Sequence, residues 1–183
     1  MKKILFIAGL CLALFVGYSF SEKYMYTNTS SQKEVAKEFD LEEILLKNGY
    51  AKIPLEKLFT GHLQLKLSVN GVEGSFLLDT GANVTTIAEK STDKFLMKTE
   101  PQEELATGVG VKNIEVQNSM RNTLRLESLE LSDYTLYVMN LDLVNQALLD
   151  YEIGEIDGIV GADILSEKEA IIDYAKLTLY LKI

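Results

Sequence analysis

The 183 residues are 47% hydrophobic and 25% charged, which is the balance of a folded protein and not of a disordered chain. This length suffices for one domain with a core but is short for two lobes of ordinary size. The net charge of −9 argues against nucleic acid or an anionic membrane surface as the main partner, because both require a basic patch.

The counts of cysteine and histidine limit the chemistry of any site. The one cysteine, Cys11, lies in an N-terminal apolar stretch, so the rest of the chain has no disulfide and no thiol chemistry. The single histidine, His62, excludes most metal centres built from histidine, and no spacing of Asp or Glu resembles a calcium loop. We therefore expect neither a metal nor a cofactor.

Residues 1–21 have the pattern of a secretory signal peptide. Lys2 and Lys3 precede an apolar stretch from Ile4 to Gly17, and Ser19-Phe20-Ser21 then supplies small residues at the −3 and −1 positions of a cleavage site. We expect export to the periplasm, the cell surface or the extracellular medium. The alternative is an uncleaved anchor, in which case the membrane would be a partner of this segment.

Residues 22–48 are expected to form a tether that ends in a short helix. The first part is polar and rich in Ser, Thr and Lys, which is typical of a flexible connection. Asp40 followed by Glu43 has the form of a capping box, and Asn48-Gly49 predicts the end of the helix. A domain is then expected over residues 49–183.

The hydrophobic pattern changes to a period of two at the start of this domain. Residues His62 to Val69 alternate, Asn70-Gly71 is the strongest short hairpin signal, and Val72 to Leu78 is expected to return as a strand. Asp79-Thr80-Gly81 interrupts that strand. A carboxylate placed there would be held at the end of a rigid strand, in a turn that contains glycine, which suits a catalytic group.

The rest of the chain predicts further short strands with a few short helices, so the fold class is mostly β. In chain order, we predict a helical turn at Ala88 to Phe95, a hairpin tip at Thr107-Gly108-Val109-Gly110, two strands between Leu124 and Met139 that turn at Ser132-Asp133, a helix at Leu141 to Leu149, a strand at Ile156 to Val160, a short helix at Ala162 to Leu165, and a closing hairpin of Ala170 to Asp173 and Leu177 to Lys182.

Two motifs together carry a resemblance to a known family. Asp-Thr-Gly alone is a weak signal, but here it stands in Phe76-Leu77-Leu78-Asp79-Thr80-Gly81-Ala82-Asn83, directly after apolar strand residues. The second motif, Ile156 to Leu165, contains Ile159-Val160-Gly161. In this arrangement the sequence resembles the retropepsin-like aspartic proteases, specifically the exported bacterial members with one lobe. The resemblance covers roughly Lys52 to Ile183 and implies a single-lobe acid-protease fold, similar to a β-barrel, with short helices.

The resemblance implies an aspartic endopeptidase in which Asp79 is the catalytic carboxylate. Such an enzyme uses two carboxylates that share one proton, because like charges ~3 Å apart cannot both ionise. The ionised carboxylate activates a water, and the protonated one donates towards the peptide carbonyl. The chain has one Asp-Thr-Gly, so the resemblance implies a homodimer with one Asp79 from each copy.

The resemblance also assigns roles to the neighbouring residues. Thr80 would donate its hydroxyl across the dimer, and Gly81 would let the backbone approach the carboxylate closely. The tip at Gly108, Val109 and Gly110 would be the flap that closes over the substrate. Gly161 would pack behind the active-site turn. The expected partner is an extended peptide or protein substrate bound by main-chain hydrogen bonds.

A second function remains open, namely a non-catalytic peptide-binding or assembly module on the same fold. Retroviral enzymes usually carry arginine directly after the glycine of the second motif, whereas this chain has Ala162. Other acidic residues are expected to be structural: Asp163 as a helix cap, and Asp157 and Asp173 at strand edges. His62, at the start of a strand, is expected on the surface or at a rim.

Overall fold

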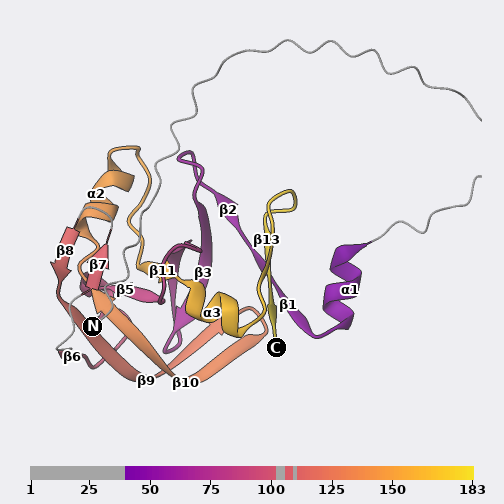
Figure 1. Cartoon of the computed structure of the whole chain (residues 1–183), viewed down its shortest axis with the longest axis horizontal. Helices are drawn as coiled ribbons and strands as arrows, with labels where there is room; N and C mark the ends of the chain where they lie inside the picture. The colour runs from indigo at the N-terminus through magenta and orange to yellow at the C-terminus, as the bar shows by residue number, and fades with distance from the viewer. Residues whose placement is uncertain (1–39, 102–105, 109–110) are drawn as a thin grey trace, which may run out of the picture. The chain divides into compact units, whose positions relative to one another are not determined.

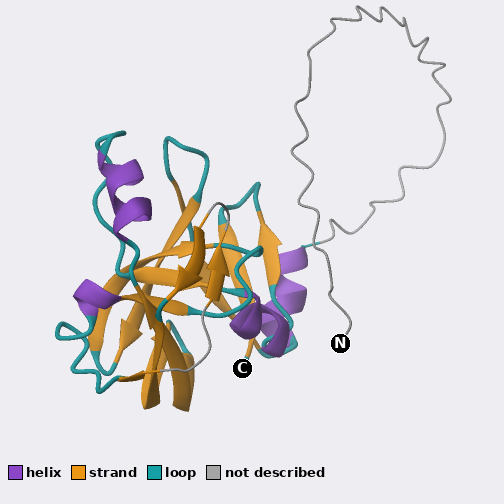
Figure 2. Cartoon of the chain, turned by 60° about the vertical axis from the view of Figure 1, so that its left-hand side comes forward, coloured by secondary structure: helices purple, strands orange, loops and turns teal. Residues whose placement is uncertain are grey.

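The computed structural model describes residues 40–101, 106–108 and 111–183, and strands make up most of the ribbon (Figures 1 and 2). The strands are β1 (Tyr50–Pro54), β2 (Glu56–Lys57), β3 (Leu63–Val69), β4 (Val72–Leu78), β5 (Thr86–Ala88), β6 (Glu100–Pro101), β7 (Ala106–Gly108), β8 (Val111–Ile114), β9 (Val116–Leu126), β10 (Leu129–Met139), β11 (Gly158–Val160), β12 (Ile171–Asp173) and β13 (Thr178–Lys182). The helices are α1 (Leu41–Lys47), the 3-10 helix η1 (Glu89–Ser91), α2 (Asp142–Leu149) and α3 (Ala162–Glu167). The prediction of a mostly β fold with short helices is confirmed.

Six strands of the main sheet close on themselves as a barrel. In hydrogen-bonded order they are β3, β4, β11, β5, β10 and β9, and β9 pairs back with β3. The pairs β4–β11 and β5–β10 are parallel, whereas the others in this ring are antiparallel. Closure leaves no free edge among these six strands. As a result, β11 is fixed on both sides, between β4 and β5.

The β3–β4 hairpin forms as the sequence predicts. Asn70 and Gly71 both have positive φ angles, 51° and 85°, and a two-residue turn of this kind matches the twist of the flanking strands. Val69 pairs with Val72 across the turn. The alternating residues of β3 are buried on one side, so the hairpin turns a continuous apolar face into the barrel.

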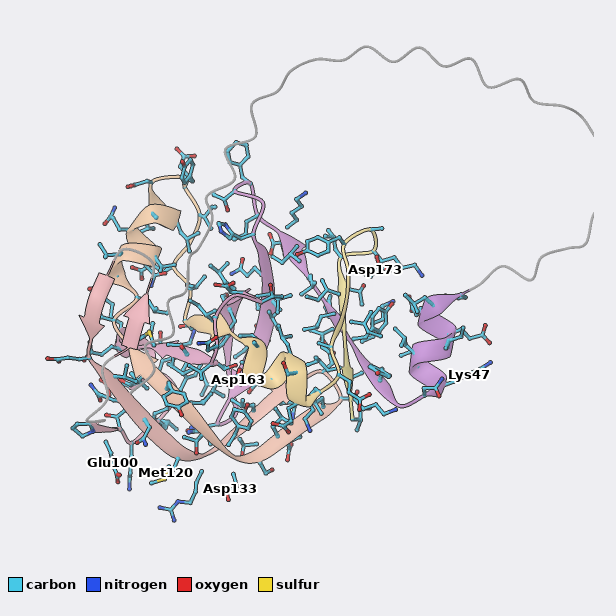
Figure 3. The ribbon with its side chains drawn as sticks, viewed as in Figure 1. Lys47, Glu100, Met120, Asp133, Asp163 and Asp173 are labelled. Carbon is cyan, nitrogen blue, oxygen red and sulfur yellow. The ribbon has the colours of Figure 1, made fainter. Side chains whose placement is uncertain are left out.

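The turn predicted at Ser132-Asp133 is wrong. The chain reverses at Glu127-Ser128, where Leu126 pairs with Leu129 across the turn. Asp133, with a φ of 57°, lies inside β10 at a point where the register with β9 shifts, which is a β-bulge. Its side chain projects outwards from the β9–β10 ribbon (Figure 3). The signal for the true turn was the leucine spacing, which lengthens from two residues to three between Leu126 and Leu129.

The predicted helices are confirmed, with small changes of boundary. The turn expected from Ala88 is η1, although Ala88 itself ends β5, and α2 and α3 lie where helices are expected. Asp40 caps α1 by accepting from the Glu42 N–H at 3.1 Å. Glu43 bonds Lys47 instead, so the reciprocal half of the capping box is not formed. Among the described residues, none of the helices is long and apolar enough to cross a membrane.

The two ends of the described chain meet in a second sheet. Its strand order is β1-β13-β12, which confirms the closing hairpin and adds β1, a strand that the sequence pattern does not predict. The Ile183 N–H donates to the Gly49 carbonyl at 2.9 Å. Within the hairpin, Asp173 accepts from the N–H groups of Ala175 and Lys176, so this carboxylate is structural, as expected.

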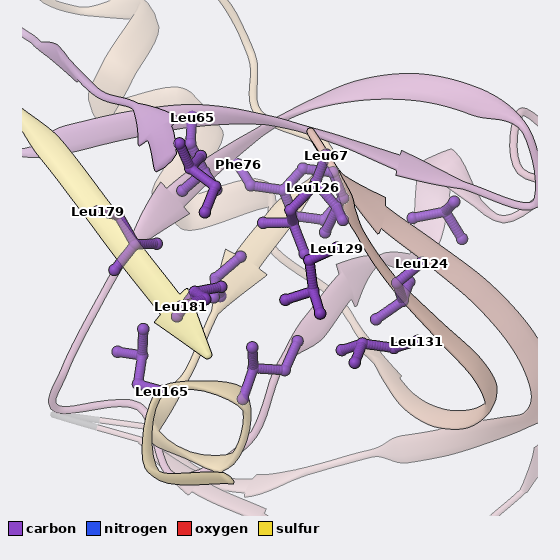
Figure 4. Close-up of a cluster of buried hydrophobic side chains, with 14 of the residues drawn as sticks. Leu65, Leu67, Phe76, Leu124, Leu126, Leu129, Leu131, Leu165, Leu179 and Leu181 are labelled. Carbon is purple, nitrogen blue, oxygen red and sulfur yellow. The ribbon is translucent and has the colours of Figure 1, made fainter. Parts of the chain in front are cut away.

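The barrel and the terminal sheet share one hydrophobic core. Each fully buried leucine in such a core contributes about 1.5–3 kcal/mol relative to exposure. The Phe76 ring also stacks on Phe95, with 6.1 Å between ring centroids. Figure 4 shows the centre of this cluster, to which β3, β4, β9, β10, α3 and β13 contribute Leu65, Leu67, Phe76, Leu124, Leu126, Leu129, Leu131, Leu165, Leu179 and Leu181.

We predict that Gly158→Ala destabilises the fold by about 1–3 kcal/mol, the usual result of overpacking a rigid core. A Cβ at this position would lie 2.3 Å from the Thr86 carbonyl oxygen and 2.6 Å from the Phe76 ring, and neither neighbour is free to move. Urea unfolding measures the change. Gly154→Ala is the matched control, since nothing lies within 4 Å of its added Cβ. Equal stability of the two variants would contradict this packing.

Candidate active site

Asp79 follows β4 directly and is anchored by its main chain. Its N–H donates to the Val160 carbonyl of β11 at 3.0 Å, and its carbonyl accepts from the Ala82 N–H at 3.2 Å. The carboxylate Oδ1 accepts from the Gly81 N–H at 2.8 Å. A Cβ on Gly81 would lie 3.2 Å from that oxygen, so the absence of a side chain permits the close approach. Asp79, Thr80 and Gly81 are all exposed, and the carboxylate is therefore open to solvent in the single chain.

The fold brings the two sequence motifs side by side. Leu78 pairs with Val160 in the parallel β4–β11 ladder, and beyond it the Ala162 N–H donates to the Ala82 carbonyl at 2.7 Å. Gly161 lies against the backbone of this turn, because a Cβ there would be 2.6 Å from the Val84 carbonyl. This agrees with the expectation that Gly161 packs behind the turn that carries Asp79.

Thr85 joins the turn to the second motif, and sequence reasoning missed this residue. Its N–H and its hydroxyl both donate to the Asp163 carboxylate, at 2.8 Å and 2.7 Å. The same hydroxyl accepts from the Gly161 N–H at 3.1 Å. Thr85 is only 1% exposed, so its bond with the Gly161 N–H is buried, while the two bonds to Asp163 are partly buried. The hydroxyl, small enough to fit between two backbones, is satisfied as donor and as acceptor.

Asp163 is structural, as the sequence predicts, although not as the N-cap itself. Gly161 occupies the N-cap position of α3, and Asp163 stands in the first turn, where its carboxylate also accepts from the Ile164 N–H at 2.8 Å (Figure 3). A negative charge at this end of a helix is favourable. Burial raises the pKa of the neighbouring Tyr134 hydroxyl far above its ordinary value, and the charges of Asp163 and Glu167 raise it further.

Asp157 holds the other end of β11. Its carboxylate accepts from the Ser75 N–H at 2.9 Å, from the Ser91 hydroxyl at 2.9 Å and from the Lys94 ammonium at 2.7 Å. Burial alone would raise the pKa of Asp157. The hydrogen bonds from Lys94, Ser75 and Ser91, together with the charge of Lys94, outweigh burial and lower the pKa below its ordinary value. Asp157 is thus a charged structural anchor, as expected.

The predicted flap is described only in part. Gly108 ends β7 and pairs with Val111 of β8, so a hairpin does stand at this place. Val109 and Gly110 lie outside the described residues, and the flap role stays a prediction. His62 is exposed, in line with the expected surface or rim position. Within the described ranges, no group of three or more His, Cys, Asp or Glu side chains is placed to hold a metal ion.

Comparison with known proteins gives one family match and several structural matches. The family described as "Aspartyl protease" matches residues 65–164, more than half of the chain. Among solved structures, a retropepsin-like aspartic protease from Rickettsia conorii is 20% identical and has a TM-score of 0.48, with 73% of this chain and 89% of that chain covered. No curated protein matches.

Two further solved structures are similar at the same level. The EIAV protease in complex with an inhibitor is 19% identical, with a TM-score of 0.43 and coverage of 57% of this chain and 85% of that chain. The retroviral protease-like domain of Ddi1 from Leishmania major is 18% identical, with a TM-score of 0.46 and coverage of 66% and 87%.

We predict that Thr85→Val lowers the free energy of unfolding by about 1–3 kcal/mol, because it leaves the buried Gly161 N–H and part of the Asp163 carboxylate without a partner. Urea unfolding measures the loss. Thr86→Val is the matched control, as Thr86 is also buried but its hydroxyl bonds only the Val84 carbonyl, at 3.2 Å. An equal loss of stability in the two variants would mean that the bonds of the Thr85 hydroxyl to Asp163 and Gly161 contribute no more than the single bond of Thr86.

Asp157→Asn should destabilise the protein at neutral pH by about 1.5–3 kcal/mol, the range for hydrogen bonds to a charged group. Since folding lowers the pKa of Asp157, its stabilising effect is complete above the ordinary aspartate value of about 3.9 and disappears as the pH falls below it. Unfolding curves of wild type and variant should therefore converge on acidification. Asp93→Asn, an exposed control on the same segment, should show no such convergence. A difference in the free energy of unfolding between wild type and Asp157→Asn that stays constant with pH would contradict the role of Asp157 as a charged anchor.

Proposed function

The chain belongs to the aspartyl protease family, and from this premise we propose that it is an aspartic endopeptidase whose catalytic carboxylate is Asp79. The observation that carries the proposal is the setting of Asp79: a solvent-open carboxylate at the end of a fixed strand, oriented by the Gly81 N–H at 2.8 Å. A catalytic group needs such positioning by rigid elements. The carboxylate would take a proton from water as the water attacks the peptide carbonyl.

The second acid of the reaction comes, in this proposal, from a second copy of the chain. Two carboxylates that share a proton supply both the base and the acid, but the chain has one Asp-Thr-Gly. The carboxylates of the second motif have other partners: Asp157 bonds Lys94 and two serines, and Asp163 bonds Thr85. The exposed Asp79 turn is free to meet its counterpart across a two-fold axis.

The remaining roles follow from the same arrangement. Thr80, which is exposed in the single chain, would donate its hydroxyl to the partner copy and fix the two turns against each other. The β7–β8 hairpin, with Gly108, Val109 and Gly110 at its tip, would close over an extended peptide and exclude water. The pattern of Lys2, Lys3 and the following apolar stretch supports export from the cytoplasm.

A binding module without catalysis is the second candidate, and Ala162 is the observation that favours it. In this chain the position offers a backbone N–H to Ala82 but no cationic side chain with which to tie two copies together. If two copies associate only weakly, the paired carboxylates form rarely and the chain would bind peptides without cutting them. The oligomeric state therefore separates the two functions.

We predict that Asp79→Asn lowers the cleavage rate of a mixed peptide library by about a hundredfold or more, because general acid–base catalysis accounts for that much. Cleavage should be followed across pH by mass spectrometry, with the oligomeric state measured by analytical ultracentrifugation. Asp133→Asn is the control: it removes the same charge from an outward-facing position with positive φ, which asparagine tolerates.

Mixing the two chains tests the dimer directly. When wild type is mixed with an equal amount of Asp79→Asn, random pairing leaves roughly one quarter of the dimers with two intact carboxylates. Activity per wild-type chain should then fall by about half. Cleavage that survives in pure Asp79→Asn would reject the mechanism. A wild type that cleaves as a strict monomer would reject the shared dyad.

A further inference from the structure

A cavity of about 370 Å³ lies at the turn end of the β3–β4 hairpin, where Asn70 lines it. Asp79 follows the other end of β4, and seven residues of strand at about 3.3 Å each separate the two ends by roughly 23 Å. The cavity shares no lining residue with a larger one of about 770 Å³ that is lined by α2 and Leu77 (the α2 cavity). It is therefore separate from the candidate active site.

The cavity lies in a gap in the strand pairing along one edge of β9. The other edge is occupied by β10. On the cavity side, β6 pairs with Gln117 and Asn118, and β3 pairs with Leu124 and Arg125. The residues from Ser119 to Asn122 lie between these two pairings, and all of them line the cavity. Within the part of the chain that the structure describes, this stretch has no strand beside it on the cavity side.

A β-bulge leaves two residues of the gap without a strand partner on either side. The register with β10 shifts between Ser119 and Asn122, so Met120 and Arg121 pair with no residue of β10. Among the described residues, neither forms a main-chain hydrogen bond outside the β9–β10 ladder. Unpaired main-chain groups at a sheet edge are where an extended segment can add as a further strand.

A buried asparagine keeps the gap in shape. The Asn122 side chain, 2% exposed, donates to the Ser119 carbonyl at 2.8 Å and accepts from the Asn70 side chain at 2.9 Å. The Asn70 side chain in turn accepts from the Thr123 N–H at 3.0 Å. The wall of the cavity is therefore formed before any ligand arrives, which reduces the entropy lost on binding.

One polar atom of the wall lacks a partner. The side-chain Oδ1 of Asn118 is the one buried side-chain nitrogen or oxygen without a hydrogen bond in the described ranges. Asn118 stands at the β6 end of the gap, where it pairs with Glu100. A buried acceptor without a donor is unfavourable. A peptide N–H in the gap would supply that donor once the amide turns towards it.

Leu96 lines the cavity in a strained conformation. Its φ of 54° is uncommon for a bulky residue, yet its side chain is 75% exposed, so packing in the core does not account for the strain. Met120, also exposed, projects outwards from β9 (Figure 3). Strained backbone clusters at ligand clamps and other functional sites. Leu96 and Met120 offer an apolar contact to a molecule in the gap.

The charged groups around the gap are mainly basic. Arg121 and Lys98 line it together with one carboxylate, Glu100, whereas the whole chain has a net charge of −9. Among the described residues, neither cation forms a salt bridge. Glu100 stands at the β6 end, so a carboxylate of a ligand is favoured at the opposite end, near Arg121.

We propose that this gap binds an extended segment of another protein, which adds to the edge of β9 as a short strand between β6 and β3. The segment runs antiparallel to β9, as β6 and β3 do. It carries an acidic side chain that meets Arg121 and Lys98, and an apolar side chain that packs on Leu96 and Met120. Main-chain pairing supplies the affinity and the two side chains supply the selectivity. Because the gap lies away from Asp79, the inference does not rest on the proposed function.

The test measures peptide binding to the full-length Asp79→Asn chain by isothermal titration calorimetry, so that cleavage does not interfere. Three pentapeptides with blocked ends have the sequence Gly-Val-X-Leu-Gly, in which X is Glu, Gln or Lys. The Glu peptide should bind about two- to fivefold more tightly than the Gln peptide, the range for exposed charges, and the Lys peptide should bind most weakly. A fourth peptide, the Glu peptide with methylated main-chain nitrogens, should bind about three- to tenfold more weakly than its parent, because it lacks the donors for strand pairing.

Arg121→Asn combined with Lys98→Gln should remove the preference for Glu over Gln. Asparagine tolerates the positive φ of 61° at position 121. Arg125→Gln is the matched control, because Arg125 lies on the same strand but bonds Glu130 and does not line the cavity. Circular dichroism checks that all variants are folded. A preference that persists in the double variant, or disappears equally in the control, would overturn the inference.

Leu96→Asn separates a role in binding from a role in packing. Asparagine accepts a positive φ, so the urea midpoint of unfolding should stay the same or rise. The Glu peptide should bind about three- to tenfold more weakly, since an apolar contact is lost. A variant that loses stability but binds the Glu peptide as tightly as its parent would overturn the inference, because Leu96 would then serve the fold alone.

Absence of binding by every peptide, or binding that methylation leaves unchanged, would overturn strand addition. Peptide binding that competes with dimerisation would make a second copy the occupant and would also overturn the inference. Glu103 and Glu104 lie outside the described residues. If the chain's own glutamates occupied the gap, a Glu103→Gln, Glu104→Gln double variant would bind the Glu peptide more tightly than its parent, which would overturn the choice of another protein. Failure of the proposed function would leave all of these binding results unchanged.

Discussion

A single buried hydroxyl connects the two halves of the site. The Thr85 side chain donates to Asp163 and accepts from the Gly161 N–H, so it links the turn after Asp79 to the segment between β11 and α3. Neither segment has a regular ladder at this point, and a buried N–H or carboxylate without a partner costs about 1–3 kcal/mol. The position of Asp79 depends on this junction, because the same turn carries both residues. The same junction requires glycine at position 161, because a side chain there would push the backbone of this segment away from the backbone of Ala82 and Val84.

Sequence reasoning succeeded where the deciding interactions are local. The β3–β4 hairpin follows from Asn70-Gly71 and the alternating leucines, and the place of Asp79 directly after β4 follows from the same pattern. Sequence reasoning failed where a residue's interaction partner lies far away along the chain. Thr85 meets Asp163 across 78 residues, and no local pattern marks either as half of a pair. β5 has three residues, too few for any periodicity, and exists because β10 and β11 flank it. The wrong prediction of a turn at Ser132-Asp133 has a similar cause. Asp133 is typical of a turn, but the long pairing of β10 with β9 continues past it, and Asp133 forms a β-bulge within β10.

The same contrast applies to α2. The sequence predicted a helix at Leu141 to Leu149, but not how the helix is used, because its use depends on which part of the barrel it covers. Between β10 and β11, the shortest connection would be a loop. The chain has a helix there instead, and the Asn145 side chain holds it by two hydrogen bonds to Ile156. One face of the helix packs on Ile156 and Leu77, and another face lines the α2 cavity. A wall made from a helix keeps its shape better than a wall made from a loop.

The terminal sheet has a consequence for the order in which the protein can fold. β13 is the central strand of that sheet and carries Leu179 and Leu181 into the shared core, yet it leaves the ribosome after every other described strand. β11 is also late and must insert between β4 and β5, with Ser75 and Asp157 meeting across 82 residues. Such distant pairings are slow to form, because loop closure must precede the contacts that reward it. The ring of six strands can therefore close only after β11 has been added, and the terminal sheet can form only after β13 has been added.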